Sequence, residues 1–507
     1  MQATPIGAST DVGPALITSA DVTLEEVERV AAQGARVELA GDVMDRLGAA
    51  RDVVDRALAA GQAAYGLNSG LGHGRDTLLS ADDLARYQVQ IVESHAAGIG
   101  PPLPDEDVRA IMFARIAGMT RGGSGAHPEV VQTLAAMLNA GLHPVVPEVG
   151  SVGASDLMHM AAIAQVAIGG GKARLAGETL PGAIALAQVG LAPCGLRPKD
   201  ALSLISGNGT SIGLGALAVL EAERIADLAD LAGVLTLEAI EGGVDPFDEE
   251  VAAAKPFPGQ IAAAAHIRAL LDGSDLAGRA GPSLQDPLSL RVMPQVHGAL
   301  REQITAARRS VETELNAVDD NPYVSVANDR LISNGNFHPL VLALAFESLR
   351  VGLAHAGALA ERRMNKVASF SFGTGALYPK AEDGDTHTPG RYAEEGVLAY
   401  SAAALSARLK HLASPVTLGC PPLDRDVEDH ATLAPLSVAL TREALQQLET
   451  ILVIEALLAA DKISSLPPRI LGTGARGPYS AILGVLEGAG GHTSLAELIE
   501  QTRAVLP

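Results

Sequence analysis

The sequence predicts an almost entirely α-helical protein, and three observations support this fold class. Long segments rich in Ala and Leu exceed the mean helix length of about 11–12 residues roughly twofold. Strand-like pieces are few and lie at residues 14–24 and 329–333. Hydrophobic residues make up 48% of the chain and aromatic residues only 3%, with no Trp, so the core must be aliphatic and closely packed.

Five segments are predicted to form the longest helices: 212–240, 296–317, 339–367, 396–412 and 433–463. Within 220–237, acidic residues and one Arg are interleaved with Leu, Ile and Ala at helical spacing, which is the pattern of an amphipathic or mostly buried helix. Long helices of low polarity bury their faces against one another, which predicts a central bundle. We expect a loop-rich helical subdomain with active-site loops at 1–200, the bundle at 201–465, and a C-terminal tail region at 466–507.

The charge balance excludes several kinds of partner. The chain of 507 residues has 37 Lys and Arg against 59 Asp and Glu, a net charge of −22 that repels nucleic acid and anionic membranes. Its two cysteines, Cys194 and Cys420, are too few for a disulfide framework or a cysteine metal site. With no signal peptide and no apolar run of about 20 residues, we expect a cytoplasmic protein without a metal.

Tyr65 lies in the glycine-rich stretch YGLNSGLG. The glycines permit left-handed backbone and an exposed phenol. The stretch is either a flexible surface loop or the site of a general base, whose phenol would need a pKa lowered by nearby cations or hydrogen-bond donors. His95 in ESHAAG and Glu428 in VEDH are, taken singly, typical of a structural histidine and a solvated charge cluster.

Four further residues in the polar loops are candidate site residues. Asn208 in SGNGT precedes a long helix and either caps it or binds a carboxylate through its amide. Arg291 and Gln295 are four residues apart, on one face if helical, and a guanidinium fork suits a carboxylate. Phe337 in SNGNFH places an aromatic ring in a polar turn before a helix.

Over residues 15–465 the chain resembles the aromatic amino acid lyases, the family of histidine and phenylalanine ammonia-lyases. The resemblance depends on motifs in that family's order: YGLNSGLG, ESHAAGIG, GSVGASDL, GNGT, QDPLSLRVMPQ, DDNP, SNGNFH and VEDH. It implies a long helix bundle of the type shared with fumarase and aspartase. It also implies a homotetramer in which loops of three subunits form each active site on a small-molecule substrate.

The resemblance implies a role for each matching residue. Tyr65 matches the base that removes the β-proton, and Arg291 matches the ligand of the substrate carboxylate. Asn208 and Gln295 match amides near the family's electrophile, and Phe337 matches the aromatic residue beside it. His95 and Glu428 match the contacts that the histidine-specific branch makes to the imidazole ring, which favours an imidazole substrate over a phenyl one.

The sequence departs from the family at the electrophile, a methylidene-imidazolone ring made from Ala-Ser-Gly followed by Asp. Here the stretch is Ala154-Ser155-Asp156, without the Gly. Ring closure needs the nitrogen after Ser to attack the Ala carbonyl in a tight turn, where Gly has the least steric cost. We therefore expect no such prosthetic group. The family's Tyr and Gln near the amine are replaced by Leu288 and Val427.

These departures resemble the ergothionases, a branch that lacks the electrophile and expels trimethylamine from ergothioneine. We expect a carbon–nitrogen lyase acting on an imidazole-bearing betaine such as ergothioneine or hercynine. Asp156 either contacts the trimethylammonium or caps the following helix. Lys380 and Lys410 either assist catalysis, by stabilising a carboxylate dienolate or lowering the pKa of Tyr65, or are solvated surface residues.

Two alternatives stay open. One is an ordinary histidine ammonia-lyase that forms urocanate and ammonia after cyclising the same loop. The other is a non-catalytic relative that kept the fold, although the match of its polar loop residues to the family pattern favours an enzyme. The sequence does not distinguish lyase from aminomutase chemistry.

Overall fold

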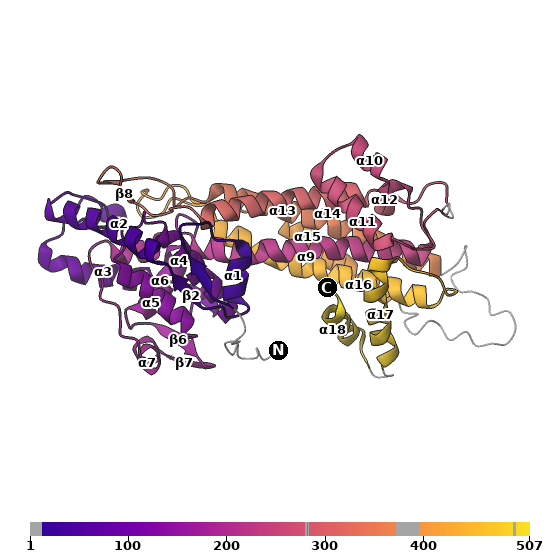
Figure 1. Cartoon of the computed structure of the whole chain (residues 1–507), viewed down its shortest axis with the longest axis horizontal. Coiled ribbons are helices and arrows are strands. Elements are labelled where there is room, and N and C mark those ends of the chain that lie inside the picture. Colours follow the sequence, from indigo (N-terminus) through magenta and orange to yellow (C-terminus); the bar gives the residue numbers. More distant parts are fainter. Residues whose placement is uncertain (1–12, 279–280, 282, 372–394, 490–492) are drawn as a thin grey trace. The chain divides into compact units, whose positions relative to one another are not determined.

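The computed structural model describes residues 13–278, 281, 283–371, 395–489 and 493–507. These residues form two compact units (Figure 1). The first unit comprises Met1–Leu220, Arg308–Ala345 and Pro415–Ala439, and the second Glu221–Ala307, Phe346–Ser414 and Leu440–Pro507. Each unit gathers segments distant in sequence. The division at residues 200 and 465 followed loop and helix content and stays a prediction.

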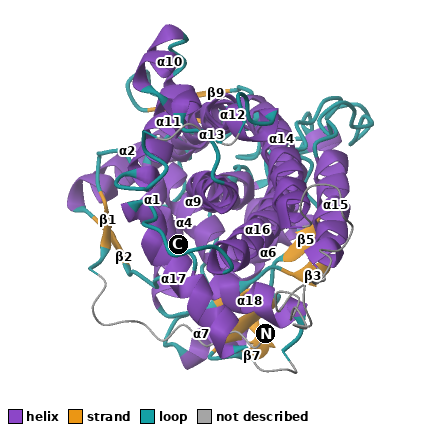
Figure 2. Ribbon diagram, turned by 90° about the vertical axis from the view of Figure 1, so that its right-hand side faces the viewer, coloured by secondary structure: helices purple, strands orange, loops and turns teal. Residues whose placement is uncertain are grey.

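The five long helices predicted from the sequence are confirmed to within about three residues at most of their ends. They are α9 (Gly209–Ile240), α13 (Met293–Leu315), α14 (Leu340–Ser371), α15 (Glu395–Leu412) and α16 (Ala434–Ser464). In Figure 2, α9, α13, α14 and α16 are viewed close to end-on, as the helices of a bundle. The mostly helical fold class is thereby confirmed.

The bundle of the second unit is closed by shorter helices: α10 (Glu249–Ala254), α11 (Pro258–Leu271), α12 (Leu288–Arg291), α17 (Thr473–Gly488), α18 (Leu495–Val505) and the 3₁₀ turn η2 (Asp245–Phe247). Close approach of helices depends on small residues: a Cβ at Gly357 would lie 2.5 Å from a methyl carbon of Leu409. The buried Arg363 guanidinium donates to both oxygens of buried Glu455 at 2.6 and 2.8 Å, which joins α14 to α16.

The first unit combines helices with small sheets. Its remaining helical elements are α1 (Leu24–Ala31), α2 (Gly41–Ala59), η1 (Gly72–Gly74), α3 (Ala81–His95), α4 (Asp105–Thr120), α5 (Pro128–Asn139), α6 (Leu157–Ala167), α7 (Gly182–Gln188) and α8 (Asp200–Ile205). Its strands are β1 (Ala15–Ile17), β2 (Val37–Leu39), β3 (Ile99–Pro102), β4 (His143–Pro144), β5 (Pro147–Val149), β6 (Lys172–Leu175), β7 (Glu178–Pro181), β8 (Tyr323–Ser325) and β9 (Arg330–Ile332).

The sheets pair as β1–β2, β3–β5, β4–β6–β7 and β8–β9. Only β1–β2 is parallel, and the others are antiparallel. The two predicted strand regions correspond to β1 and β9. All the described strands have two to four residues, too few for a pattern of alternating polarity to show reliably in the sequence.

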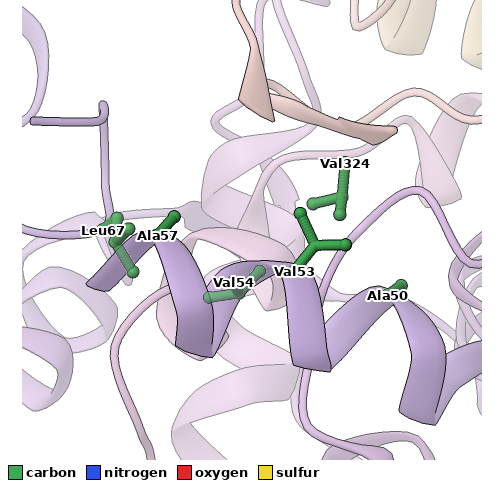
Figure 3. Close-up of a cluster of buried hydrophobic side chains, with 6 residues drawn as sticks. All are labelled: Ala50, Val53, Val54, Ala57, Leu67 and Val324. Carbon is green, nitrogen blue, oxygen red and sulfur yellow. The ribbon is translucent and has the colours of Figure 1, made fainter. Parts of the chain in front are cut away.

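A buried hydrophobic cluster fixes the loop that follows α2. Val53, Val54 and Ala57 of this helix pack with Leu67 of the loop and Val324 of β8, together with Ala50 (Figure 3). Leu67 is fully buried, and it lies two residues after Tyr65. The cluster therefore anchors the Tyr65 loop on a rigid helix.

Two helical segments are long and apolar enough to pass a membrane-span test based on length and composition, which the sequence inspection did not find. In Asp200–Ile240, 94% of the apolar 18-residue stretch is buried inside the protein, and in Leu340–Val367 the share is 44%. The core helix of a folded bundle passes the same test.

Replacing Leu67 with Ala is expected to lower the free energy of unfolding by about 2–5 kcal/mol, because it leaves a cavity against α2. Urea denaturation measures the change. The matched control is Leu284→Ala, since Leu284 is fully exposed and the same substitution there removes no buried contact. Equal effects of the two substitutions would contradict the anchoring role of Leu67.

Candidate active site

A cavity of about 790 Å³ lies in the first unit, where four loop segments meet. It is lined by Ala63, Ala64, Tyr65, Ser69, Arg75, Asp76, Leu78, Ala154, Asn321, Ser333, Phe337, His338, Val427, Glu428, Asp429 and His430. Four residues predicted as site residues, Tyr65, Ala154, Phe337 and Glu428, are thus brought together from positions up to 363 residues apart (428 − 65). Carboxylates outnumber cationic groups on its wall.

Tyr65 is half-buried, and its phenol oxygen accepts a hydrogen bond from the Gly72 backbone N–H at 3.0 Å. Burial raises the pKa of Tyr65, the Gly72 N–H lowers it, and the carboxylates of Glu428 and Asp424 raise it further. The net shift of the pKa is upward. The structure thus supplies one of the donors that a phenolate needs, but within the chain the charges near Tyr65 are acidic.

The two residues expected to contact an imidazole ring are close enough to interact electrostatically. His95 is the last residue of α3, and its Nδ1 lies 2.8 Å from the Ile91 carbonyl oxygen, which fixes the ring. Burial raises the pKa of Glu428, Asp424 raises it further, and His95 lowers it. Glu428 lines the cavity, whereas His95 is not among its lining residues.

Two backbone hydrogen bonds hold the Ala154–Asp156 stretch. Ser155 has a left-handed φ of 61°, and its N–H donates to the Phe337 carbonyl at 2.9 Å. The Asp156 N–H donates to the Gly207 carbonyl at 2.8 Å. Of the three residues only Ala154 lines the cavity.

The Asp156 side chain is fully buried, and it does not cap α6. Its carboxylate accepts the N–H of Ser211 at 2.7 Å and the Ser211 hydroxyl at 3.2 Å, in the first turn of α9. Burial raises the pKa of Asp156 to about 7. Asp156 therefore joins the shortened loop to α9 and does not face the cavity as a trimethylammonium ligand.

Asn208 is fully buried, directly before α9. Its backbone N–H donates to Asp319 at 2.6 Å, but neither atom of its side-chain amide has a hydrogen-bond partner among the described residues. It therefore does not cap the helix. A buried amide without partners is costly unless a ligand or another chain satisfies it.

Arg291 and Gln295 belong to the second unit. They lie in different helices, because α12 ends at Arg291 and α13 begins at Met293, so the condition under which they would share one helical face is not met. The Arg291 Nε donates to the Asp286 carbonyl at 2.7 Å. Gln295 lines a separate cavity of about 470 Å³, and its Oε1 is buried without a partner among the described residues.

Of the two lysines that are candidates for assisting catalysis, the structure describes Lys410, which does not line the cavity. Lys410 is exposed in the last turn of α15 in the second unit. Lys380 lies outside the described residues. Leu288, which stands where the family has Tyr, is exposed in α12, whereas Val427 lines the cavity in place of the family's Gln.

Sequence inspection missed several lining residues, of which His338 and His430 are the most informative. His338 Nε2 lies 2.9 Å from His430 Nδ1. Burial lowers the pKa of His338, and His430 lowers it further. Each is the last residue of a motif, His338 of SNGNFH and His430 of VEDH, so their position in these motifs was the available signal. Arg75 and Asp76 carry no such signal, because they lie beyond the glycine-rich motif.

One trio of possible metal ligands occurs among the described residues, formed by Asp227, Asp230 and His266 of the second unit. Arg301 donates to both carboxylates, at 2.7 Å to Asp227 and 2.5 Å to Asp230. The guanidinium already compensates the charge that a metal ion would neutralise.

The mostly helical fold and the loops that bring Tyr65, Phe337 and Glu428 to one cavity agree with the lyase class that the motifs indicate. The family model for aromatic amino acid lyases matches residues 22–480, and the chain belongs to that family. It is 40% identical to histidine ammonia-lyase of Anaeromyxobacter sp. (strain K) over 467 residues, which cover 89% of this chain and 90% of the relative. These matches identify a carbon–nitrogen lyase.

Two solved structures are similar over 97% of this chain. The ergothioneine-degrading enzyme ergothionase from Treponema denticola superposes with a TM-score of 0.89 at 30% identity over 98% of its chain. Tyrosine aminomutase from Streptomyces globisporus gives a TM-score of 0.89 at 30% identity over 96% of its chain. The resemblance predicted from the motifs is thereby confirmed.

The raised pKa of Asp156 predicts a pH dependence of stability. The folded state holds this proton up to about pH 7, whereas the unfolded carboxyl loses it near its ordinary value of 3.8. The free energy of unfolding should therefore fall as pH rises between these values, by an amount on the order of 4 kcal/mol at about 1.4 kcal/mol per pKa unit. Asp156→Asn should flatten that fall, as measured by denaturation at pH 4.5 and pH 8. An unchanged slope would contradict the assignment.

Proposed function

We propose that this chain eliminates trimethylamine from an imidazole-bearing trimethylammonium betaine, such as ergothioneine or hercynine, without the family's electrophile. The observation that carries the proposal is the Ala154–Asp156 stretch. We take these residues not to fit the ring, because Asp156 stands where ring closure favours Gly, and its N–H, the nitrogen that would attack the Ala154 carbonyl, donates to the Gly207 carbonyl. The side chain that replaces the missing Gly is also buried against α9.

The chemistry of the leaving group supports a betaine. The primary amine of an amino acid loses its charge by deprotonation, whereas a quaternary nitrogen stays cationic at every pH and departs as a neutral amine. Tyr65 takes the proton from the β-carbon, and the electrons of that C–H bond form the new double bond. The electrons of the bond between the α-carbon and nitrogen leave with trimethylamine, so no activating group on nitrogen is required.

The charge of the cavity supports a cationic substrate. Glu428, Asp429 and Asp76 line it, with Arg75 as the cation among the described lining residues. A fixed positive charge within about 4–6 Å lowers the pKa of a neighbouring acid. A bound betaine would therefore counter the raised pKa of Tyr65. We assign Glu428 and His95 to the imidazole ring and Phe337 to the wall beside it.

The proposal includes a homotetramer in the cytoplasm that shares its active sites between subunits. Its support is that the described residues of one chain do not by themselves provide hydrogen-bond partners for all of its candidate site residues. Buried amide atoms of Asn208 and Gln295 lack partners within the described chain. Exposed apolar side chains on the bundle helices, Val351 and Tyr400 among them, fit burial against further copies. Lys380 and Lys410 stay candidates for assisting residues from other subunits.

The second candidate is histidine ammonia-lyase, favoured by the 40% identity to enzymes of that name. It requires that Ala154 and Ser155 cyclise after all. The third, a non-catalytic relative, is disfavoured because Tyr65 and Glu428 meet at one cavity.

The decisive experiment incubates the protein with histidine, hercynine and ergothioneine and assays ammonia, trimethylamine and the acrylate product. We expect trimethylamine from a betaine and no ammonia from histidine. The intact mass should equal that of the encoded chain, because ring formation would remove water. Urocanate from histidine together with a mass deficit would establish the ammonia-lyase instead, and no product from any substrate would favour the non-catalytic relative.

Tyr65→Phe is expected to lower kcat by about 10²–10⁴-fold, the usual contribution of a general base. The matched control is Tyr87→Phe. The Tyr87 phenol oxygen accepts the Leu71 N–H at 2.9 Å in the same loop, but Tyr87 does not line the cavity. The rate of trimethylamine release measures kcat in both variants. Comparable losses of kcat in the two would show that the loop and not the base had been damaged.

A further inference from the structure

A strained turn precedes Glu428. Three consecutive residues other than Gly, Asp424, Arg425 and Asp426, have left-handed φ angles of 46°, 54° and 64°. Leu423 and Glu428 close the turn, their backbone N–H groups donating to each other's carbonyls at 2.8 and 3.2 Å. Left-handed backbone is unfavourable for L-residues, and it persists where surrounding contacts fix it. The contacts of Asp424 are therefore expected to fix this turn.

The Asp424 carboxylate holds a second loop. One of its oxygens accepts the backbone N–H of His73 at 2.8 Å, and the other lies 2.6 Å from His73 Nδ1. His73 is the middle residue of the turn η1. At neighbouring Gly72, whose φ is +52°, a Cβ would overlap Asp424 Oδ2. Glycine is thus required both by the backbone angle and by the approach of the carboxylate.

The same turn supplies the hydrogen-bond donor to Tyr65. The Gly72 N–H, one residue before the clamped His73, donates to the phenol oxygen at 3.0 Å. A donor aimed at this oxygen stabilises the phenolate relative to the phenol. The chain of contacts runs from Asp424 through His73 and Gly72 to Tyr65, and all four residues belong to the first unit.

We propose that Asp424 is a positioning residue for Tyr65, because its carboxylate fixes η1 so that the Gly72 N–H points at the phenol oxygen. The proposal rests on the proposed function in one respect, the role of Tyr65 as the base. It adds a residue outside the cavity lining, on the turn that also presents Glu428. One turn thereby sets the geometry of both the base and a substrate-binding carboxylate.

The test compares Asp424→Gly, Asp424→Asn and the matched control Asp426→Gly. Each substitution to Gly removes a carboxylate from a left-handed position without backbone strain, so the control accounts for added freedom of the turn. Loss of a hydrogen bond that stabilises a charged group predicts a fall in kcat of about 10–100-fold for Asp424→Gly, with KM within about threefold. Asp424→Asn, which keeps an acceptor, should recover most of kcat, and Asp426→Gly should stay within about threefold of wild type.

The pH profile distinguishes positioning from a merely structural role. Burial, Glu428, Asp424 and Tyr87 raise the pKa of Tyr65, while the Gly72 N–H lowers it. Asp424→Asn removes one of these charges and retains the clamp. Asp424→Gly removes the same charge and also loses the clamp, so the rise of kcat/KM with pH should lie at higher pH in Asp424→Gly than in Asp424→Asn. Equal kcat in Asp424→Gly and Asp426→Gly, or the same pH profile in Asp424→Gly and Asp424→Asn, would overturn the proposal.

Hydrogen–deuterium exchange separates failure of this proposal from failure of the proposed function. If wild type turns over none of the three substrates, the proposed function fails, but exchange in residues 66–78 still reports on the clamp. We expect exchange there to be about tenfold faster or more in Asp424→Gly than in Asp426→Gly. Exchange that matches between these two variants would overturn the clamp irrespective of activity.

Discussion

The first unit depends on one buried guanidinium, that of Arg115 in α4. It donates to Asp319 at 2.8 Å and Asp320 at 3.0 Å, and also to the carbonyl of Ser203 in α8. Removing one partner of such a group leaves an uncompensated buried charge, so the contacts must be kept together. A Cβ at Gly207 would overlap the guanidinium, which explains the glycine there. Arg115 therefore fixes the backbone on which the cavity loops converge.

A series of hydrogen bonds connects the loops of the cavity to the residues around Arg115. Asp319 accepts the Asn208 N–H, Gly207 accepts the N–H of Asp156, and Phe337 accepts the N–H of Ser155. Each of these bonds has a main-chain donor and two of the three acceptors are carbonyls, so most side chains in the loops can change while the geometry is maintained. This explains how a family fold can keep Tyr65 in place while the stretch around Ala154 loses a residue.

The sequence predicted the long helices well, because each has many apolar positions at a 3.6-residue period and helix ends depend on local residues. It predicted the cavity only through motif order. Nothing in the local pattern around Tyr65 indicates that Glu428 lies beside it, since that proximity depends on the packing of α2 and of the turn at 423–428. The spacing of Arg291 and Gln295 left open whether one helix holds both, and the break between α12 and α13 separates them. The upward pKa shift of Tyr65 was missed because burial is a tertiary property.

The acidic surroundings of Tyr65 acquire a consistent meaning if the substrate is permanently cationic. With the cavity empty, burial and two carboxylates keep the phenol protonated, which prevents an idle base from carrying an uncompensated charge. Asp76 and Asp429, which also line the cavity, attract a trimethylammonium group, and its charge then favours the phenolate. Binding and activation of the base would be coupled through one electrostatic interaction. A substrate that can lose its charge by deprotonation would not maintain that coupling, and this is a physical reason why a site that works without the electrophile would prefer a betaine.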